Sequence, residues 1–154
     1  SEYLSAVHGL VAGKLPQLDL DAERRLLTLL LAAHKENLLA SAHDLSHGGL
    51  AIALVECCLS GGMGAQIDLP PDDIRLDALL FGETPSRVVV SCRPRLVDRV
   101  QELAAAHGVP CVTLGKVGEQ ELVICQGQRE IIDMSLKRAR DIYSQAISKR
   151  LQIG

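Results

Sequence analysis

The chain has 154 residues, which suffices for one domain with a sizeable core and is too short for two ordinary domains. Hydrophobic residues make up 47% and charged residues 23%, which excludes a disordered tail and a fibrous protein. A net charge of -3 and an aromatic content of 2% without Trp argue against a nucleic-acid-binding protein, which needs a basic face and often stacking rings. The composition therefore predicts a folded globular domain.

The sequence also argues against a membrane or secreted protein. Its longest apolar stretches, residues 26–33 and 50–59, are far shorter than the roughly 18 residues of a membrane span. We recognise no signal or transit peptide. The five cysteines form no C-x-x-C pair and lie in apolar runs, where buried free thiols are common. These features predict reduced thiols in a cytoplasmic protein without membrane partners.

The N-terminal third is predicted to be helical. Residues 1–18 read as a helix followed by a linker, because Gly13 and Pro16 interrupt the helical spacing, and residues 19–154 read as the domain proper. The next helix begins at Asp19 or Asp21 and ends near residue 37, with acidic residues in its first turn, Glu23 among them, that suit the helix dipole. Its predicted apolar face consists of Leu26, Leu27, Leu30, Leu31 and His34.

Helices and strands alternate over the remaining sequence. A short apolar segment at 38–43 precedes a helix over 48–59 that is apolar on most sides, with Ser46 as its predicted N-cap and Gly62 near its end. Strands are predicted over 65–69, 87–92, 111–117, 121–126 and 130–133. Further helices are predicted over 74–80, 95–107 and 136–151, the last capped by Ser135. Three late strands follow one another, so the predicted fold class is α/β (α+β), with a mixed sheet packed with helices.

The segment 43–50, His-Asp-Leu-Ser-His-Gly-Gly-Leu, is the first candidate site. If it joins a strand to a helix, backbone N–H groups of residues 46–49 converge at the helix start, and Gly48 and Gly49 let an anion such as phosphate approach closely. Asp44 can then contact magnesium or orient a donor. The alternative is that the glycine pair only permits a tight turn and that His43 is a packed strand residue.

The same segment contains two histidines, His43 and His47, at the spacing of an H-E-x-x-H zinc site. That site requires one continuous helix, and Ser-His-Gly-Gly is a poor helix interior. Leu50 and Ala53 occupy the positions of a third ligand. We therefore predict no metal ligand in this chain.

The segment 81–87, Phe-Gly-Glu-Thr-Pro-Ser-Arg, is the second candidate site. Its hydroxyl groups and Arg87 can together bind an anionic group, since the guanidinium offers a planar fork to phosphate or carboxylate. The alternative is an internal ion pair between Glu83 and Arg87. No G-x-S-x-G, Walker A or G-x-G-x-x-G motif occurs, and we predict no catalytic residue.

Three segments together resemble one family: Ser-Glu-Tyr-Leu at 1–4, the block at 42–54, and Phe-Gly-Glu-Thr-Pro-Ser-Arg-Val-Val-Val at 81–90. They are similar to the C-terminal domain of phosphoribosylformylglycinamidine synthases, in a superfamily that includes aminoimidazole ribonucleotide synthase. The H-D-x-S-x-G-G-L block is common to that superfamily, and the other two segments are more particular to the synthases. This sequence departs from the family pattern at His47, where an acid is usual, and at Thr84, which replaces a serine.

The resemblance implies a fold like the C-terminal domain of aminoimidazole ribonucleotide synthase. It implies an ATP-dependent ligase of purine biosynthesis that converts formylglycinamide ribonucleotide to its amidine with glutamine-derived ammonia. ATP and magnesium would serve the full-length enzyme, and the partners would be its N-terminal domains and a glutamine amidotransferase. The isolated domain would be inactive. The alternative is a non-catalytic ligand-binding or regulatory module with the same fold.

The resemblance also implies which residues lie near a ligand, without assigning a chemical step to any of them. The family's enzyme contains two pairs of N- and C-terminal domains, and this chain resembles the C-terminal domain of the second pair. One pair performs catalysis and the other can hold a structural nucleotide, and the resemblance leaves open which of these roles the second pair has. The implied substrate- or nucleotide-binding residues are Asp44, Ser46, Gly48, Gly49, Gly82, Glu83, Ser86 and Arg87.

Overall fold

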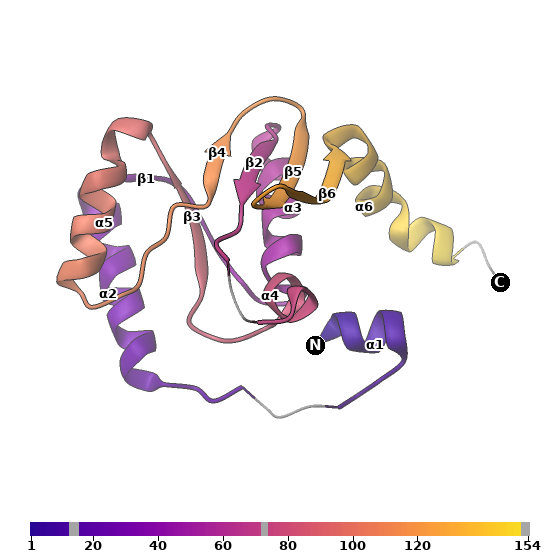
Figure 1. Ribbon diagram of the computed structural model, residues 1–154, viewed down its shortest axis with the longest axis horizontal. Helices are drawn as coiled ribbons and strands as arrows, with labels where there is room; N and C mark the ends of the chain where they lie inside the picture. Colours follow the sequence, from indigo (N-terminus) through magenta and orange to yellow (C-terminus); the bar gives the residue numbers. More distant parts are fainter. Residues whose placement is uncertain (13–15, 72–73, 152–154) are drawn as a thin grey trace. The chain divides into compact units, whose positions relative to one another are not determined.

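The structure, a computed structural model, describes residues 1–12, 16–71 and 74–151 (Figure 1). Gly13 of the predicted linker and residues 152–154 of the predicted domain lie outside the described residues. The chain forms two compact units. The first comprises Ser1–Ala53 and Ile74–Thr113, and the second comprises Leu54–Asp73 and Leu114–Gly154. Both candidate segments belong to the first unit.

The first unit contains a two-stranded antiparallel sheet flanked in sequence by helices. Strand β1 (Leu39–Asp44) pairs with β3 (Val88–Cys92), and Asp44 lies opposite Val88. This pairing brings the end of β1 and the beginning of β3 together, and therefore the two segments that carry the predicted site. The helical elements of this unit are α1 (Glu2–His8), α2 (Leu20–Lys35), the start of α3 (Gly49–Gly61), α4 (Leu76–Phe81), a 3-10 turn (Pro94–Leu96) and α5 (Val97–Ala106).

Helix α2 begins at the predicted cap. The Asp19 carboxylate accepts hydrogen bonds from the backbone N–H groups of Asp21 at 2.9 Å and Ala22 at 3.0 Å, and these bonds lower its pKa. Helices α2 and α5 lie side by side in Figure 1 and share a core with the residue that precedes β1. The buried members of this core are Leu29, Ala33, Leu38, Val100, Leu103 and Ala104.

The predicted apolar face of α2 is only partly correct. Leu26, Leu29 and Ala33 are the buried residues of the helix, whereas Leu27 and Leu31 are 53% and 63% exposed. Because the helix contains apolar residues over most of residues 26–33, its sequence does not determine which stripe packs against α5.

Helix α1 has no buried residue and is joined to α4 by an aromatic contact. Tyr3 stacks on Phe81 with ring centroids 4.5 Å apart and an interplanar angle of 4°, and His8 packs against the Tyr3 ring edge-on. Such stacks contribute roughly 0.5–1.5 kcal/mol beyond the area that they bury. Two of the three aromatic residues of the chain are thus used to place the N-terminal segment beside the Phe-Gly-Glu segment.

The second unit contains a four-stranded mixed sheet of order β4-β2-β5-β6. Strand β2 (Ala65–Asp68) pairs parallel with β5 (Glu121–Gln126), while β4 (Gly115–Val117) and β6 (Arg129–Ser135) pair antiparallel with their neighbours. Leu69, Leu122 and Ile124 are the most deeply buried large side chains. The mixed sheet is confirmed, although the strands divide into two sheets and β2 lies between β4 and β5.

Two further predictions need correction. The strand expected over 111–117 is limited to Gly115–Val117, because its short partner β2 ends at Asp68, whose N–H bonds to the Leu114 carbonyl. All five cysteines are free, but the expected burial is confirmed only for Cys58: Cys57, Cys92 and Cys125 are partly buried and Cys111 is exposed.

The predicted start of α6 and the predicted end of α3 are confirmed. Ser135 caps α6 (Leu136–Leu151) through its hydroxyl, which accepts from the Arg138 N–H at 3.4 Å. Helix α3 is followed by Gly62 in the left-handed conformation. Within the described ranges, no helix is both long and apolar enough to cross a membrane.

Gly64 provides a test of the second unit. A Cβ atom at Gly64 would lie 2.0 Å from the carbonyl oxygen of Glu121, so Gly64→Ala should force β5 away and lower the free energy of unfolding by about 2 kcal/mol or more. Urea denaturation measures this loss. Gly61→Ala is the control, since a Cβ at Gly61 meets open space at the end of α3 and should leave stability unchanged or slightly higher. Equal midpoints for the two variants would contradict the close approach of Gly64 to β5.

Candidate functional site

The three segments that carry the family resemblance meet at one carboxylate. Oε1 of Glu83 accepts hydrogen bonds from the backbone N–H of Glu2 at 2.8 Å and from that of Gly48 at 3.0 Å. Glu83 follows α4, Glu2 begins α1, and Gly48 directly precedes α3. Residues separated by 81 and 35 positions in sequence are therefore bound to the same side-chain oxygen.

The surroundings of Glu83 keep it ionised. Burial alone would raise the pKa of its carboxyl group, but the hydrogen bonds from the Glu2 and Gly48 amides outweigh burial, with a smaller contribution from His47. The net result is a pKa below the usual value of 4.5. Glu83 is thus a charged acceptor that is already engaged by backbone amides.

The two glycines after His47 are required by the backbone. Gly48 and Gly49 have φ angles of +79° and +65°, which residues with a side chain rarely adopt. A Cβ at Gly49 would lie 2.8 Å from the Gly82 carbonyl oxygen, and one at Gly48 would lie 2.4 Å from Cγ1 of Ile52. The glycine pair therefore permits a tight turn into α3, and the glycine at 49 also allows the start of α3 to approach the end of α4.

The Ser46 side chain does not cap α3 as predicted. Ser46 contributes its backbone carbonyl, which accepts from the Gly49 N–H at 3.2 Å. Among the described residues, no hydrogen bond joins the Ser46 hydroxyl to the helix start. The charged acceptor for the Gly48 N–H at the start of α3 is Glu83, so this amide is not open to an external anion.

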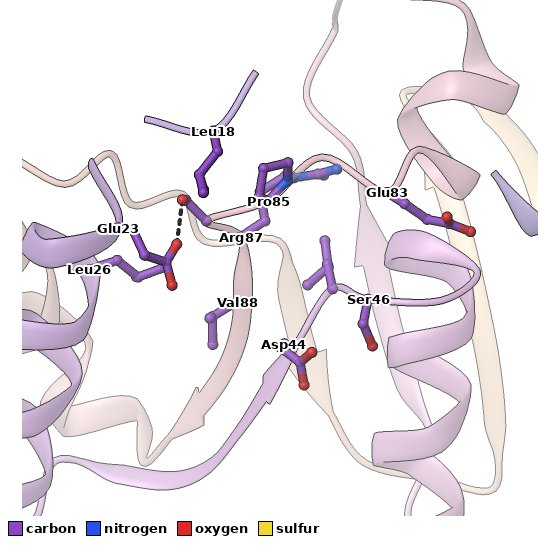
Figure 2. A pocket seen from close by; sticks show the side chains of 11 residues that line it. Leu18, Glu23, Leu26, Asp44, Ser46, Glu83, Pro85, Arg87 and Val88 are labelled. Carbon is purple, nitrogen blue, oxygen red and sulfur yellow. Dashed lines mark hydrogen bonds between the residues drawn. The ribbon is translucent and has the colours of Figure 1, made fainter. Parts of the chain in front are cut away.

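A pocket of about 480 Å³ lies next to this junction (Figure 2). It gathers five of the eight predicted ligand-binding residues, from the end of β1 and the loop before β3. These are Asp44, Ser46, Glu83, Ser86 and Arg87. Apolar side chains such as Leu26, Leu45 and Val88 form the rest of its wall. The remaining three predicted residues, Gly48, Gly49 and Gly82, are absent from the lining and shape the backbone instead.

Arg87 is the cation of this pocket. It is half-buried, and burial lowers the pKa of its guanidinium, which stays charged at neutral pH. Among the described residues, no carboxylate lies within ion-pair distance of it. The alternative, a Glu83–Arg87 ion pair, does not form, because Glu83 is bound to the amides of Glu2 and Gly48. Figure 2 shows the Arg87 side chain beside Pro85 in the pocket wall. An unpaired, partly desolvated guanidinium attracts anions.

Asp44 is the most accessible acid of the pocket, with a side chain 73% exposed. Nδ1 of His43 lies 2.7 Å from the Asp44 carbonyl oxygen, and 3.9 Å from one of its carboxylate oxygens. His43 is on β1 and His47 lies in the loop that follows, so the continuous helix of an H-E-x-x-H site is absent here. Within the described part of the chain, no three His, Cys, Asp or Glu side chains are grouped to hold a metal ion.

Glu23, expected from the sequence only as an acid in the first turn of α2, also lines the pocket. Its Oε2 accepts a hydrogen bond of 2.5 Å from the Ser86 hydroxyl, drawn as a dashed line in Figure 2. Ser86 itself has a φ of +61°. The two residues are 63 positions apart, and no motif or spacing links them in the sequence.

Comparison with known proteins agrees with this geometry. Residues 1–127 match the family model described as AIR synthase related protein, C-terminal domain. The chain belongs to this family. It is 42% identical over 137 residues, 89% of the chain, to phosphoribosylformylglycinamidine synthase subunit PurL of Moorella thermoacetica, and 38% identical over 158 residues, 98% of the chain, to that of Prochlorococcus marinus strain NATL1A. It spans 19% and 20% of these two relatives, about a fifth of their length.

Solved structures show the same AIR synthase related C-terminal fold. Thermotoga maritima PurL complexed with FGAR matches with a TM-score of 0.76 at 24% identity, over 86% of this chain and 23% of that one. The ATP complex of the same protein matches with a TM-score of 0.72 at 23% identity, over 79% and 22%. The PurLQS structure from this organism matches with a TM-score of 0.72 at 22% identity, over 88% and 24%. At these identities the likeness concerns the fold alone.

The Glu83 junction yields a prediction for stability against pH. Because the folded-state pKa of Glu83 is depressed, its carboxylate stabilises the fold above the unfolded value of 4.5, and this contribution is lost as pH falls through the folded-state pKa. At pH 7, Glu83→Gln should therefore unfold at a lower urea concentration than the wild type. Its free energy of unfolding should be about 1–2 kcal/mol lower, since a neutral amide accepts these bonds less strongly.

The difference between Glu83→Gln and the wild type should shrink as pH is lowered below 4.5. Urea denaturation of both proteins at pH 7 and near pH 3 measures it. Glu121→Gln is the control, because it removes an exposed acid on β5 and should give no such pH-dependent difference. A constant deficit at both pH values would show that the Glu83 charge contributes nothing.

Proposed function

We propose that the chain is the C-terminal domain of a phosphoribosylformylglycinamidine synthase, an ATP-dependent ligase of purine biosynthesis that converts formylglycinamide ribonucleotide to its amidine. The observation that carries this proposal is 38–42% identity, over 89–98% of the chain, to PurL proteins of that name. The meeting of the three resemblance segments at Glu83 supports it, because two of them are particular to the synthases and have a shared structural role there.

Within that enzyme, the pocket beside Glu83 would supply half of a ligand site. Arg87 would bind a phosphate group of the nucleotide or of the substrate, since it is half-buried and has no carboxylate partner among the described residues. The Ser46 hydroxyl and Asp44 carboxylate lie in the same pocket and would contact polar groups of the same ligand. Glu83 and the glycines at 48, 49 and 82 would act by shaping the site.

The side chains present fit a nucleotide better than they fit an independent metal centre. Magnesium is often held by one or two carboxylates together with phosphate oxygens, and Asp44 is an exposed carboxylate in the pocket. The described residues provide no group of three metal ligands. Magnesium would therefore enter with ATP, which supplies the phosphoryl group that activates the amide oxygen of the substrate.

The remainder of the reaction would belong to other parts of the enzyme. The chain spans about a fifth of its PurL relatives, and a solved PurLQS structure shares its fold. The N-terminal domains would complete the cleft, a glutamine amidotransferase subunit or domain would supply ammonia, and the assembly would work in the cytoplasm. The isolated chain would be inactive.

A domain exchange tests the proposed activity. The matching segment of Moorella thermoacetica PurL is replaced by this chain, and amidine formation from formylglycinamide ribonucleotide, ATP and ammonia is assayed. We expect the chimera to retain measurable ATP-dependent turnover and the isolated chain to show none. The parent enzyme and the chimera are compared by thermal unfolding, so that misfolding is recognised. A chimera that folds like the parent but is inactive would contradict the proposal and favour a non-catalytic binding module.

Arg87 tests the proposed site. Arg87→Ala in the chimera should weaken ATP or formylglycinamide ribonucleotide binding about tenfold or more, the usual effect of losing a charge-assisted hydrogen bond, while the urea midpoint hardly changes. Arg99→Ala is the control, because Arg99 pairs with Glu36 at 2.9 Å on an exposed surface away from the pocket lining. Equal affinity for both ligands in wild type and Arg87→Ala would exclude Arg87 from the site.

A further inference from the structure

Ser86 adopts a conformation that its own side chain disfavours. Its φ of +61° lies in the left-handed region, which residues with a Cβ rarely occupy outside special turns. Such a conformation persists only where the surrounding structure holds it. The loop before β3 therefore needs a contact that keeps Ser86 in this state.

That contact comes from Glu23. The Ser86 hydroxyl donates to Oε2 of Glu23 at 2.5 Å, in a partly buried position. Glu23 lies in the first turn of α2, whose start is fixed by the Asp19 cap and whose next turns bury Leu26 and Leu29. A well-anchored helix thus holds the strained residue of the loop.

The residue after Ser86 is Arg87, and its backbone is bound by the segment that follows β1. The Arg87 carbonyl oxygen accepts a hydrogen bond of 3.0 Å from the N–H of Leu45, immediately after β1. Ser86 is therefore bound to α2 while Arg87 is bound beside β1. Between these two anchors, the backbone conformation of Ser86 determines where the Arg87 side chain enters the pocket.

We propose that Glu23 is a positioning residue: by accepting the Ser86 hydroxyl it holds the left-handed turn that places the Arg87 guanidinium in the pocket wall. The inference rests on the proposed function only in taking the ligand of Arg87 to be anionic. Glu23 acts through Ser86, so it is needed as a hydrogen-bond acceptor and not as a charge. A glutamine at this position keeps an acceptor oxygen, and a glycine at position 86 accepts the positive φ without help.

The experiment uses six variants, one of them a control, and two readouts. The first readout is hydrogen exchange of the Leu45 amide in the chain without ligand, since this amide reports the position of the Arg87 carbonyl. In Glu23→Ala, we expect the Leu45 amide to exchange about tenfold faster than in wild type. In Glu23→Gln and Ser86→Gly, its exchange rate should stay within about threefold of wild type. In the double variant Glu23→Ala/Ser86→Gly, the effect of the first change should disappear.

The second readout is ATP affinity of the chimera, which should follow the same order. Asp21→Ala is the matched control, because it removes an acid from the same turn of α2 and should change neither readout. Ser86→Ala removes the same hydrogen bond from the other side and should repeat Glu23→Ala, which covers the case in which Glu23→Ala does not fold.

Each outcome decides the matter. An unchanged Leu45 exchange rate in both Glu23→Ala and Ser86→Ala overturns the positioning role. So does a Glu23→Ala effect that persists in the Ser86→Gly background, or a Glu23→Gln variant as impaired as Glu23→Ala. If Leu45 exchange follows the expected order while ATP affinity is unaffected, the positioning of Arg87 is supported and the anion site of the proposed function is the part that fails.

Discussion

The Glu83 carboxylate is the interaction on which the candidate site depends. One oxygen accepts the amides of Glu2 and Gly48, so a single ionised side chain fixes both the N-terminal helix and the turn into α3. Charged acceptors form stronger hydrogen bonds to backbone amides than neutral ones do. The Tyr3–Phe81 stack and the glycine pair at 48–49 follow from the same arrangement, because each allows these segments to approach the end of α4. Around this junction, β1 and β3 present their ends to the pocket.

This use of Glu83 changes the electrostatics expected of the site. Glu23, Asp44, Glu83 and Arg87 all lie in the pocket lining, a balance that looks acidic by residue count. Two of the three acids are engaged as acceptors, Glu83 by backbone amides and Glu23 by a hydroxyl. Of the described lining residues, Arg87 is the one with a permanent positive charge, and its side chain is partly shielded from water. Ligand affinity should then depend on where that guanidinium is held rather than on net charge.

Local signals in the sequence predicted much of the fold. The caps at Asp19 and Ser135, the left-handed glycine after α3, and most strands were found because each depends on neighbouring residues. The wrong or missing predictions concern contacts between residues that are far apart in the sequence. Neighbouring residues in the sequence do not indicate that the Glu83 carboxylate binds backbone amides and not the Arg87 guanidinium. Nor do they indicate that Ser86 pairs with Glu23, or that β2 lies between β4 and β5. The sequence analysis assigned both motif loops to a ligand only through the family resemblance, and the pairing of β1 with β3 is what brings the two loops together.

The residues of the two units alternate along the sequence, and this limits where related genes can recombine within the region. Residues 54–73 of the second unit interrupt the first, and residues 74–113 of the first interrupt the second. Any single breakpoint along the chain therefore divides at least one unit between two parents. A recombination event within this region would join halves that had not diverged together. Gene shuffling should consequently transmit this region as one block, and libraries of family chimeras should place their crossovers outside it.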